Sequence, residues 1–299
     1  MDDRPTRTCL SRRALGGAGL AFGLSALLPG FARAQAAPGN RVVCVSKQIN
    51  EFIFAIGAQS HLVARDLTSI YPPAIRRLPS VGYHRALSAE GIVSMRPSVL
   101  LTDGNVGPEP VLAQVRSVGI PVVTMPPGET PEAAQSLLLQ LGRYFGRDAA
   151  ARAVLARWKA NLAGARAAVA ASPARARPRV LMIHFGQIGN SYLGLSRGGP
   201  ADAIIALAGG VNALDQVGGM AHLTPEMIAL AAPDIIIATD VGFDRYGSAA
   251  AFRNLPGVAL TPAGKAMRIF RIDETEIMYF GPRTGDALRK IAGWLHPRR

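Results

Sequence analysis

The stretch Leu87-Ser88-Ala89-Glu90-Gly91-Ile92 recurs 136 residues later as Leu223-Thr224-Pro225-Glu226-Met227-Ile228. In each copy a hydroxyl side chain stands two residues before an acid, as at the N-cap and first turn of a helix. Each copy is followed by a proline and an apolar run typical of a buried strand, namely Pro97 with Val99-Leu100-Leu101 and Pro233 with Ile235-Ile236-Ile237. One helix-to-strand unit is therefore used twice, which predicts an α/β fold of two similar lobes with mostly parallel sheets covered by helices.

Residues 148–171, between the two copies, are rich in Ala, Arg and Leu and contain no Gly or Pro before Gly164. Ala and Arg are strong helix formers, so this stretch predicts one helix of about 24 residues, roughly 35 Å long at 1.5 Å per residue. We expect this long, rigid α-helix, assigned to residues 148–172, to join an N-terminal lobe over residues 41–147 to a C-terminal lobe over residues 178–299. A helix that belongs wholly to one lobe is the alternative.

The N-terminus has the order of an export signal peptide. Paired arginines at Arg12 and Arg13 precede an apolar run over residues 15–28, and Ala32-Arg33-Ala34 forms a small-x-small cleavage site. The run is shorter than the about 20 residues that a membrane-spanning helix needs. We therefore expect residues 1–34 to be removed and the mature chain to be periplasmic. The paired arginines favour the twin-arginine (Tat) route, and a Sec signal that carries two arginines is the alternative.

The chain is strongly basic, with 33 Lys and Arg against 20 Asp and Glu and a formal net charge of +13. The expected signal holds five Arg and two Asp, so the mature chain keeps a charge of +10. We expect no nucleic-acid partner in an exported compartment. The charge favours an anionic ligand or an anionic membrane surface, unless it only reflects an Arg-rich composition. Cys44 would be the one remaining cysteine, which excludes a disulfide and a cysteine-based metal site in a monomer, the state that we expect.

One motif suggests an enzyme, because Gly194-Leu195-Ser196-Arg197-Gly198 fits the G-x-S-x-G pattern of serine hydrolases. That pattern needs a helix directly after the serine, and an acid and a histidine later in the chain. Here Gly199 and Pro200 delay the helix, and the later histidines, His222 and His296, have no obvious acid partner. We expect the protein not to be an enzyme. A periplasmic serine hydrolase that uses Ser196 is the alternative from another functional class.

The segment before the first repeated helix carries Tyr83, His84 and Arg85. In a parallel α/β sheet such a connection lies at the edge where ligands collect. A tyrosine phenolate is a hard oxygen ligand that can bind haem iron, and a nearby cation such as Arg85 favours its ionisation. A packing tyrosine beside a solvated arginine is the alternative.

Two strings of the sequence resemble periplasmic haem-binding proteins of bacterial ABC haem importers, and the resemblance covers nearly all of the mature chain. They are Leu78-Pro79-Ser80-Val81-Gly82-Tyr83-His84-Arg85-Ala86-Leu87-Ser88-Ala89-Glu90-Gly91-Ile92 and Phe280-Gly281-Pro282-Arg283-Thr284. The resemblance implies two lobes bridged by one long helix, haem as the transported ligand, and an inner-membrane ABC permease as the partner. It also implies that Tyr83 is the haem-iron ligand, and the only residue that binds a metal, and that Arg85 lies in the haem site.

Four further assignments follow from the same resemblance. His84 stands where the relatives usually have Met, so it would support the haem site or act as a second iron ligand. His184 is the candidate for a histidine of the second lobe near the iron or a second haem, and a hydrogen-bonded histidine at a strand end is the alternative. Glu90 and Glu226 correspond to acids that dock onto basic residues of the permease, although each could equally be a first-turn acid that stabilises its helix.

Taken together, these features predict a periplasmic solute-binding protein that captures haem between its lobes and delivers it to an ABC importer. Other binding proteins share the two-lobed plan, so a ferric-siderophore or cobalamin binder is the alternative within the same class.

Overall fold

The computed structural model describes residues 41–171, 177–184 and 192–297. The predicted export signal, residues 1–34, lies outside the described residues. The N-terminal lobe is built on a four-stranded sheet in the order β2-β1-β3-β4, in which every pair is parallel. Its strands are β1 (Val42–Cys44), β2 (Leu62–Arg65), β3 (Val99–Thr102) and β4 (Val122–Thr124).

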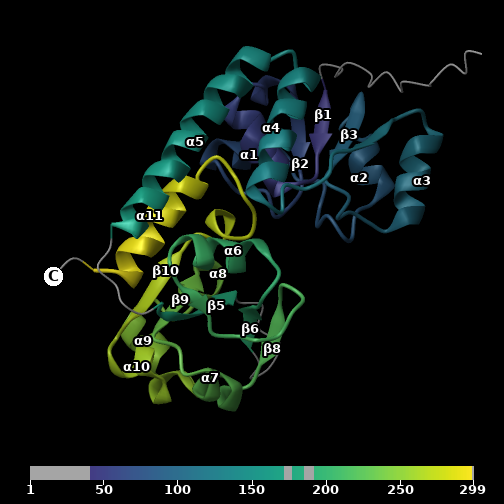
Figure 1. Ribbon diagram of the computed structural model, residues 1–299. Coiled ribbons are helices and arrows are strands. Elements are labelled where there is room, and N and C mark those ends of the chain that lie inside the picture. The colour runs from purple at the N-terminus through teal and green to yellow at the C-terminus, as the bar shows by residue number, and fades with distance from the viewer. Residues whose placement is uncertain (1–40, 172–176, 185–191, 298–299) are drawn as a thin grey trace, which may run out of the picture. The chain divides into compact units, whose positions relative to one another are not determined.

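Helices cover both faces of this sheet (Figure 1). On one face lie α1 (Lys47–Ala55) and α4 (Pro131–Tyr144), and on the other lie α2 (Ala89–Val93) and α3 (Glu109–Ser117). The 3-10 turns η1 (Gln59–His61) and η2 (Pro73–Arg77) flank β2. A parallel sheet needs apolar residues on both faces, and all four residues of β3 are buried.

The C-terminal lobe has a six-stranded sheet in the order β10-β9-β5-β6-β8, with β7 paired to β5. Its strands are β5 (Arg179–His184), β6 (Tyr192–Leu195), β7 (Val211–Asn212), β8 (Ala221–Leu223), β9 (Ile235–Thr239) and β10 (Ile269–Ile272). The pairs of β5, β7, β9 and β10 are parallel, whereas β6 runs antiparallel to β5 and β8. The predicted fold class, two α/β lobes with mostly parallel sheets, is confirmed.

Helices again cover both faces. One face packs against α6 (Pro200–Leu207) and α11 (Thr284–Leu295), and the other against α7 (Pro225–Ala231), α9 (Ala249–Arg253) and α10 (Pro262–Lys265). The short helix α8 (Asp240–Phe243) follows β9, and the 3-10 turns are η3 (Val258–Leu260) and η4 (Glu274–Glu276).

The sequence repeat forms the same local structure twice. The Ser88 side chain accepts a hydrogen bond from Gly91 N at 3.0 Å, and the Thr224 side chain accepts one from Met227 N at 3.3 Å, so both repeated helices have the expected N-cap. The repeat also extends to a feature that the sequence did not reveal. The residue before each proline, Arg96 or Ala232, has a positive φ of 47° or 42°. Non-glycine residues seldom adopt this conformation, so the two copies share an unfavourable turn into the strand.

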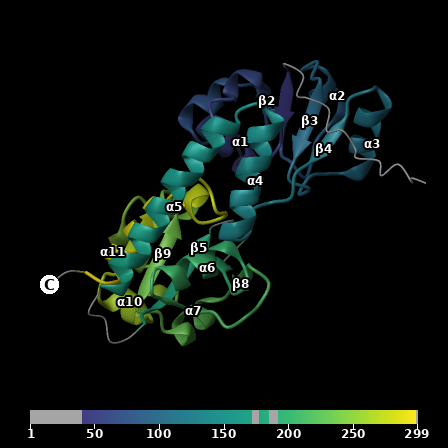
Figure 2. The ribbon, with the colours of Figure 1, turned by 45° about the horizontal axis from the view of Figure 1, so that its top comes forward.

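The long helix α5 (Asp148–Ala170) joins the lobes and lies against α4 and α11 in both ribbon views (Figures 1 and 2). Its buried residues follow one helical stripe: Ala151, Val154, Trp158, Leu162 and Ala165. A single cluster of buried apolar side chains contains this stripe together with core residues of both lobes. The hydrophobic core therefore continues from one lobe to the other through α5. Within the described ranges, neither α5 nor any other helix combines the length and apolarity needed to span a membrane.

Candidate functional site

Tyr83 lies on a loop at the carboxyl end of β2. The chain runs beside the end of β2, where Val81 N donates to Arg65 O at 2.9 Å and Leu67 N donates to Gly82 O at 2.7 Å. It then turns at Gly82, whose φ of 102° is one that residues with a side chain rarely adopt. The turn places the Tyr83 side chain at the surface, where it is 43% exposed. The phenol is thus accessible to a ligand.

His84 points into the protein beside this exposed tyrosine, and its side chain is only 14% exposed. Its Nδ1 lies 3.7 Å from Asp66 Oδ2 and 3.5 Å from Thr68 Oγ1, while its Nε2 lies 3.5 Å from Asn105 Nδ2. The rings of Tyr83 and His84 are tilted against each other with centroids 4.4 Å apart. Both ring nitrogens of His84 therefore face polar groups of the N-terminal lobe.

Arg85 is held by the same residue that contacts His84. Its Nε donates to Asn105 Oδ1 at 2.9 Å, and Asn105 follows the carboxyl end of β3. The loops after β2 and β3 are also joined through the backbone, since Gly107 N donates to His84 O at 2.9 Å. The structure thus brings Tyr83, His84 and Arg85 together at the sheet edge where parallel α/β sheets bind ligands.

Asp66, directly after β2, is a member of the site that the sequence analysis missed. It is fully buried, and its carboxylate accepts hydrogen bonds from Thr68 N at 2.9 Å and from the hydroxyls of Thr68 and Ser69. Burial raises the pKa of the Asp66 carboxyl, but the interactions with His84, Ser69 and Thr68 outweigh burial and lower this pKa below its ordinary value. The buried carboxylate is therefore ionised at neutral pH.

His184 lies at the end of β5, in a network that crosses between the lobes. Its Nδ1 is 3.6 Å from Glu274 Oε2 and 3.3 Å from Thr239 Oγ1. The other oxygen of Glu274 pairs with Lys47 Nζ, from α1, at 3.1 Å. Burial lowers the pKa of the His184 imidazole, although Glu274 acts in the opposite direction. The described contacts of His184 are thus those of a hydrogen-bonded residue at a strand end, and its role near haem stays a prediction.

Glu90 and Glu226 occupy matching positions in the first turns of α2 and α7, and Glu226 is fully exposed. Interaction with the Thr224 side chain lowers the pKa of the Glu226 carboxyl. Both acids can serve as helix-stabilising charges in this position, and neither has an ion-pair partner among the described residues. Exposed, unpaired acids at repeated positions are also suited to contact a basic partner.

The second string of the family resemblance, around Arg283, packs against α1 of the N-terminal lobe and against α5. Arg283 Nε pairs with Glu51 Oε1 of α1 at 2.7 Å, and Tyr279 OH donates to Glu51 Oε2 at 2.9 Å. Nearby, Trp158 Nε1 of α5 donates to Gly281 O at 2.8 Å. These buried contacts hold the start of α11 against α1 and α5, so the string has a structural role that the sequence analysis did not foresee.

Among the described residues, the surroundings of Ser196 lack the geometry of a serine hydrolase active site. Ser196 is fully buried and its Oγ has no hydrogen-bond partner within the described ranges. His222 is exposed on β8, where it pairs with Leu193 of β6. A nucleophilic serine needs a base within hydrogen-bond reach and access for the substrate. The described part of the chain also contains no cluster of three or more His, Cys, Asp or Glu side chains suited to hold a metal ion.

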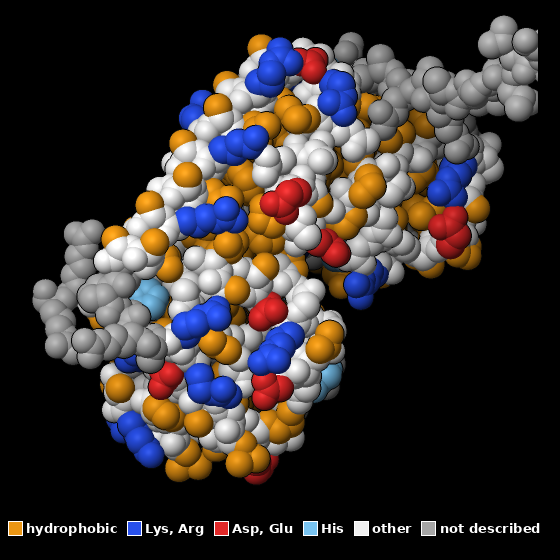
Figure 3. Space-filling model, viewed as in Figure 1, with side chains coloured by type: hydrophobic (Ala, Val, Ile, Leu, Met, Phe, Trp, Pro, Cys, Tyr) orange, Lys and Arg blue, Asp and Glu red, His pale blue; other side chains and the backbone are white. Residues whose placement is uncertain are grey.

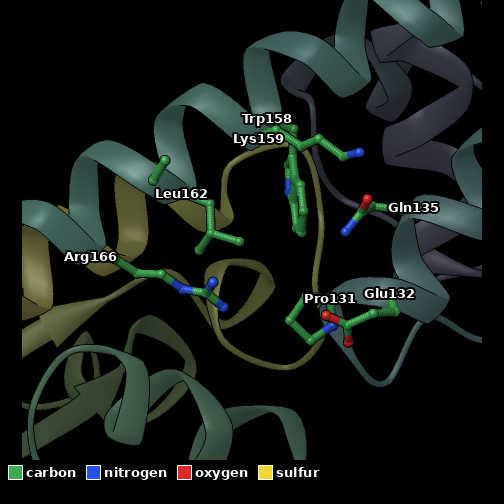
Figure 4. A pocket seen from close by; sticks show the side chains of 8 residues that line it. Pro131, Glu132, Gln135, Trp158, Lys159, Leu162 and Arg166 are labelled. Carbon is green, nitrogen blue, oxygen red and sulfur yellow. The ribbon is translucent and has the colours of Figure 1, made fainter.

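A cavity of about 390 Å³ lies between α4 and α5 (Figure 4). It is lined by Pro131, Glu132, Gln135, Trp158, Lys159, Leu162, Ala163 and Arg166. None of these residues belongs to the predicted site. Figure 3 shows that Lys and Arg side chains are spread along α5 and over the C-terminal lobe on the face in view.

Comparisons with known proteins agree on the type of fold. The sequence model described as "Periplasmic binding protein" matches residues 42–276. Among curated proteins, the vitamin B12-binding protein of Photorhabdus laumondii subsp. laumondii is 30% identical over 118 residues. That match covers 39% of this chain and 43% of the relative, so less than half of the relative's length is matched.

Among solved structures, the periplasmic heme-binding protein BhuT, in complex with two hemes, is 35% identical with a TM-score of 0.78. The match covers 86% of this chain and 97% of BhuT. The periplasmic heme-binding protein RhuT from Roseiflexus sp. RS-1 is 31% identical with the same TM-score and the same coverage. A periplasmic heme-binding protein from Pseudomonas aeruginosa is 30% identical, with a TM-score of 0.77 and coverage of 86% and 93%.

Proposed function

Because the chain belongs to the periplasmic binding protein family, we propose that it captures haem in the periplasm and delivers it to an inner-membrane ABC importer. Members of this family bind and release a solute, so we propose that no bond of the haem is made or broken. In this proposal the chain acts as a monomer and is exported through its residues 1–34, by the Tat route.

The observation that carries the proposal is the half-exposed Tyr83 beside Arg85 at the carboxyl edge of the N-terminal sheet. The phenol oxygen can bind ferric haem iron as phenolate. Arg85 uses Nε to donate to Asn105, and its terminal nitrogens have no hydrogen-bond partner in the described ranges. These nitrogens are available to a carboxylate, so we propose that Arg85 binds a haem propionate or supports the phenolate. Similarity to three heme-binding proteins at 30–35% identity supports this choice of ligand.

A second candidate ligand is cobalamin, because a vitamin B12-binding protein is 30% identical to part of the chain. Titration of the purified mature chain with haemin and, separately, with cyanocobalamin distinguishes the two ligands. We expect haemin to give a saturable Soret band with the high-spin spectrum of a tyrosinate complex, and cyanocobalamin to give no heat in calorimetry. Binding of cyanocobalamin without a Soret shift for haemin would replace haem by cobalamin in the proposal.

We further propose that Glu90 and Glu226 dock onto basic residues of the permease. Reversing both charges, by Glu90→Lys together with Glu226→Lys, is expected to lower ATP-dependent haem transport by the reconstituted importer about tenfold. Charges at the rim of a protein–protein interface mainly steer the association of the two partners, here the binding protein and the permease. Haem binding by the free protein should not change.

Glu132→Lys provides a matched control, since Glu132 is also an exposed first-turn acid but lies on α4, outside the repeat. Transport with this variant should equal that of the wild type. Undiminished transport with the double charge reversal would show that the two acids only stabilise their helices.

A further inference from the structure

The hydrogen-bond chemistry around Asn105 determines which nitrogen of His84 carries a proton. Arginine has donors only, so the Asn105 atom that lies 2.9 Å from Arg85 Nε must be the amide oxygen. The amide nitrogen of Asn105 therefore faces His84 Nε2, at 3.5 Å. Because this amide nitrogen is a donor, His84 Nε2 must accept, and the proton of the neutral ring lies on Nδ1.

The protonated Nδ1 faces the buried carboxylate of Asp66 and the hydroxyl of Thr68. Donors and acceptors then follow one direction, from Arg85 through Asn105 and His84 to Asp66. Asp66 is also fixed from behind, because the Ser69 hydroxyl that donates to it accepts a hydrogen bond from Asn50 Nδ2 at 2.9 Å. This hydrogen-bond network thus connects Arg85 at the surface to the buried Asp66 inside the lobe.

This network contacts both side chains proposed to bind haem. Asn105 accepts a hydrogen bond from the guanidinium of Arg85, and the His84 ring packs against the Tyr83 ring with centroids 4.4 Å apart. His84 has no ring nitrogen left for iron while Asn105 and Asp66 occupy both. An apolar residue at position 84 would leave the carboxylate of Asp66 without its imidazole partner.

We propose that Asp66, His84 and Asn105 form a positioning relay that fixes Tyr83 and Arg85 for haem binding, and that His84 is not an iron ligand. This inference rests on the proposed function. It assigns a positioning role to Asp66, His84 and Asn105 and gives the iron a single protein ligand. Partners that orient a metal ligand in this way typically change metal affinity by 10- to 100-fold when they are replaced.

The first test uses the ligand-free protein and needs no haem. Long-range ¹H–¹⁵N correlation spectra at pH 7.5 should show His84 as the Nδ1–H tautomer, and Asn105→Asp should alter this signal because an aspartate carboxylate cannot donate to Nε2. His222, which is exposed on β8, serves as the reference histidine. An Nε2–H tautomer of His84 in the wild type would overturn the relay.

The second test measures haem loss to apomyoglobin. We expect His84→Ala to release haem about 10- to 100-fold faster and Asn105→Ala about tenfold faster. Both variants should keep tyrosinate bands in resonance Raman spectra, with a broadened phenolate C–O stretch. Asp66 is buried, so its replacement would disturb folding, whereas Asn105 is exposed. The Asn105 variant therefore tests the relay in a folded protein. His222→Ala should behave as the wild type.

Two results of this second test would also overturn the inference. One is a low-spin wild-type spectrum that His84→Ala converts to high spin, which would make His84 an iron ligand. The other is haem loss at the wild-type rate from both His84→Ala and Asn105→Ala. Failure of the wild type to bind haemin at all is a different result, because it overturns the proposed function while the tautomer measurement still reports on the relay.

Discussion

Replacing Tyr83 by Phe is expected to weaken haem binding about 1,000-fold, which corresponds to about 4 kcal/mol. The substitution removes one oxygen atom and keeps the ring that packs against His84. In the proposed complex this oxygen is the only protein ligand of the iron, so its loss leaves haem held by apolar contacts and by Arg85 alone. Haemin titrations of both proteins, followed by absorption and resonance Raman spectroscopy, measure the effect. The tyrosinate bands should be absent from the variant.

Leu67→Ala is the matched control for this experiment. Leu67 is 57% exposed on the loop that pairs with Gly82, so the variant removes apolar surface at the same sheet edge and keeps the phenol. Its affinity should fall by no more than about 30-fold, because losing the apolar contacts of a few CH₂ groups costs about 1–2 kcal/mol, and its tyrosinate bands should remain. Tyrosinate bands in Tyr83→Phe that match those of the wild type would assign the iron to another tyrosine.

The two lobes could be predicted from the sequence because the repeat consists of local signals. Ser88 and Thr224 cap their helices through neighbours three residues away, and the apolar runs of β3 and β9 are buried as their composition indicates. The antiparallel direction of β6 could not be predicted in this way. Strand direction depends on which strands become neighbours, and that choice is made by tertiary packing.

The candidate site could be predicted only in part, because it too depends on tertiary packing. Tyr83, His84 and Arg85 are adjacent in the sequence, but Asn105 lies 21 residues from His84 and meets it only because β2 and β3 end at one edge of the sheet. The sequence signal for Asp66 and Asn105 was limited to polar residues just after strands. For Ser196 the motif suggested a nucleophile, and burial of its side chain, which no motif encodes, argues against that role.

The contact between Glu51 and Arg283, 232 residues apart, leads to the second large expected effect. Arg283→Ala should lower the free energy of unfolding by about 3 kcal/mol, because removal of one partner leaves a buried charge without compensation. Glu51 is the charge affected, since its side chain is only 4% exposed. Two other acids lie near Arg283: Glu276 keeps Lys290 at 2.6 Å, and Asp273, 3.9 Å from Arg283, still accepts a hydrogen bond from Thr275 N. Urea unfolding followed by circular dichroism measures the change.

Arg116→Ala removes an arginine from an exposed ion pair and is the matched control. Arg116 and Glu109 are 2.6 Å apart, with side chains 47% and 70% exposed. Exposed pairs contribute about 0–1 kcal/mol, so this variant should unfold almost as the wild type does. Equal destabilisation by the two substitutions would mean that the contact between α1 and the start of α11 contributes no more than a surface pair.

The destabilisation by Arg283→Ala should also depend on pH. Burial raises the pKa of the Glu51 carboxyl, and Arg283 is the main group that lowers it, so the substitution raises this pKa further. Tyr279 still donates to the carboxylate, and Asp273 still raises the pKa of Glu51. The pKa of a glutamate carboxyl is about 4.3 in the unfolded chain, and the pKa of Glu51 in the folded variant lies above it. At pH values between these two pKa values, the folded variant binds more protons than the unfolded chain. Its free energy of unfolding therefore falls as the pH rises through this window. The variant should therefore lose less stability relative to the wild type at pH 5 than at pH 8. The ring centroid of Tyr71 lies 3.5 Å from the guanidinium carbon of Arg283. A loss of stability that is the same at both pH values would show that Glu51 is not the group left without compensation. Arg283 would then stabilise the contact mainly through its packing on Tyr71.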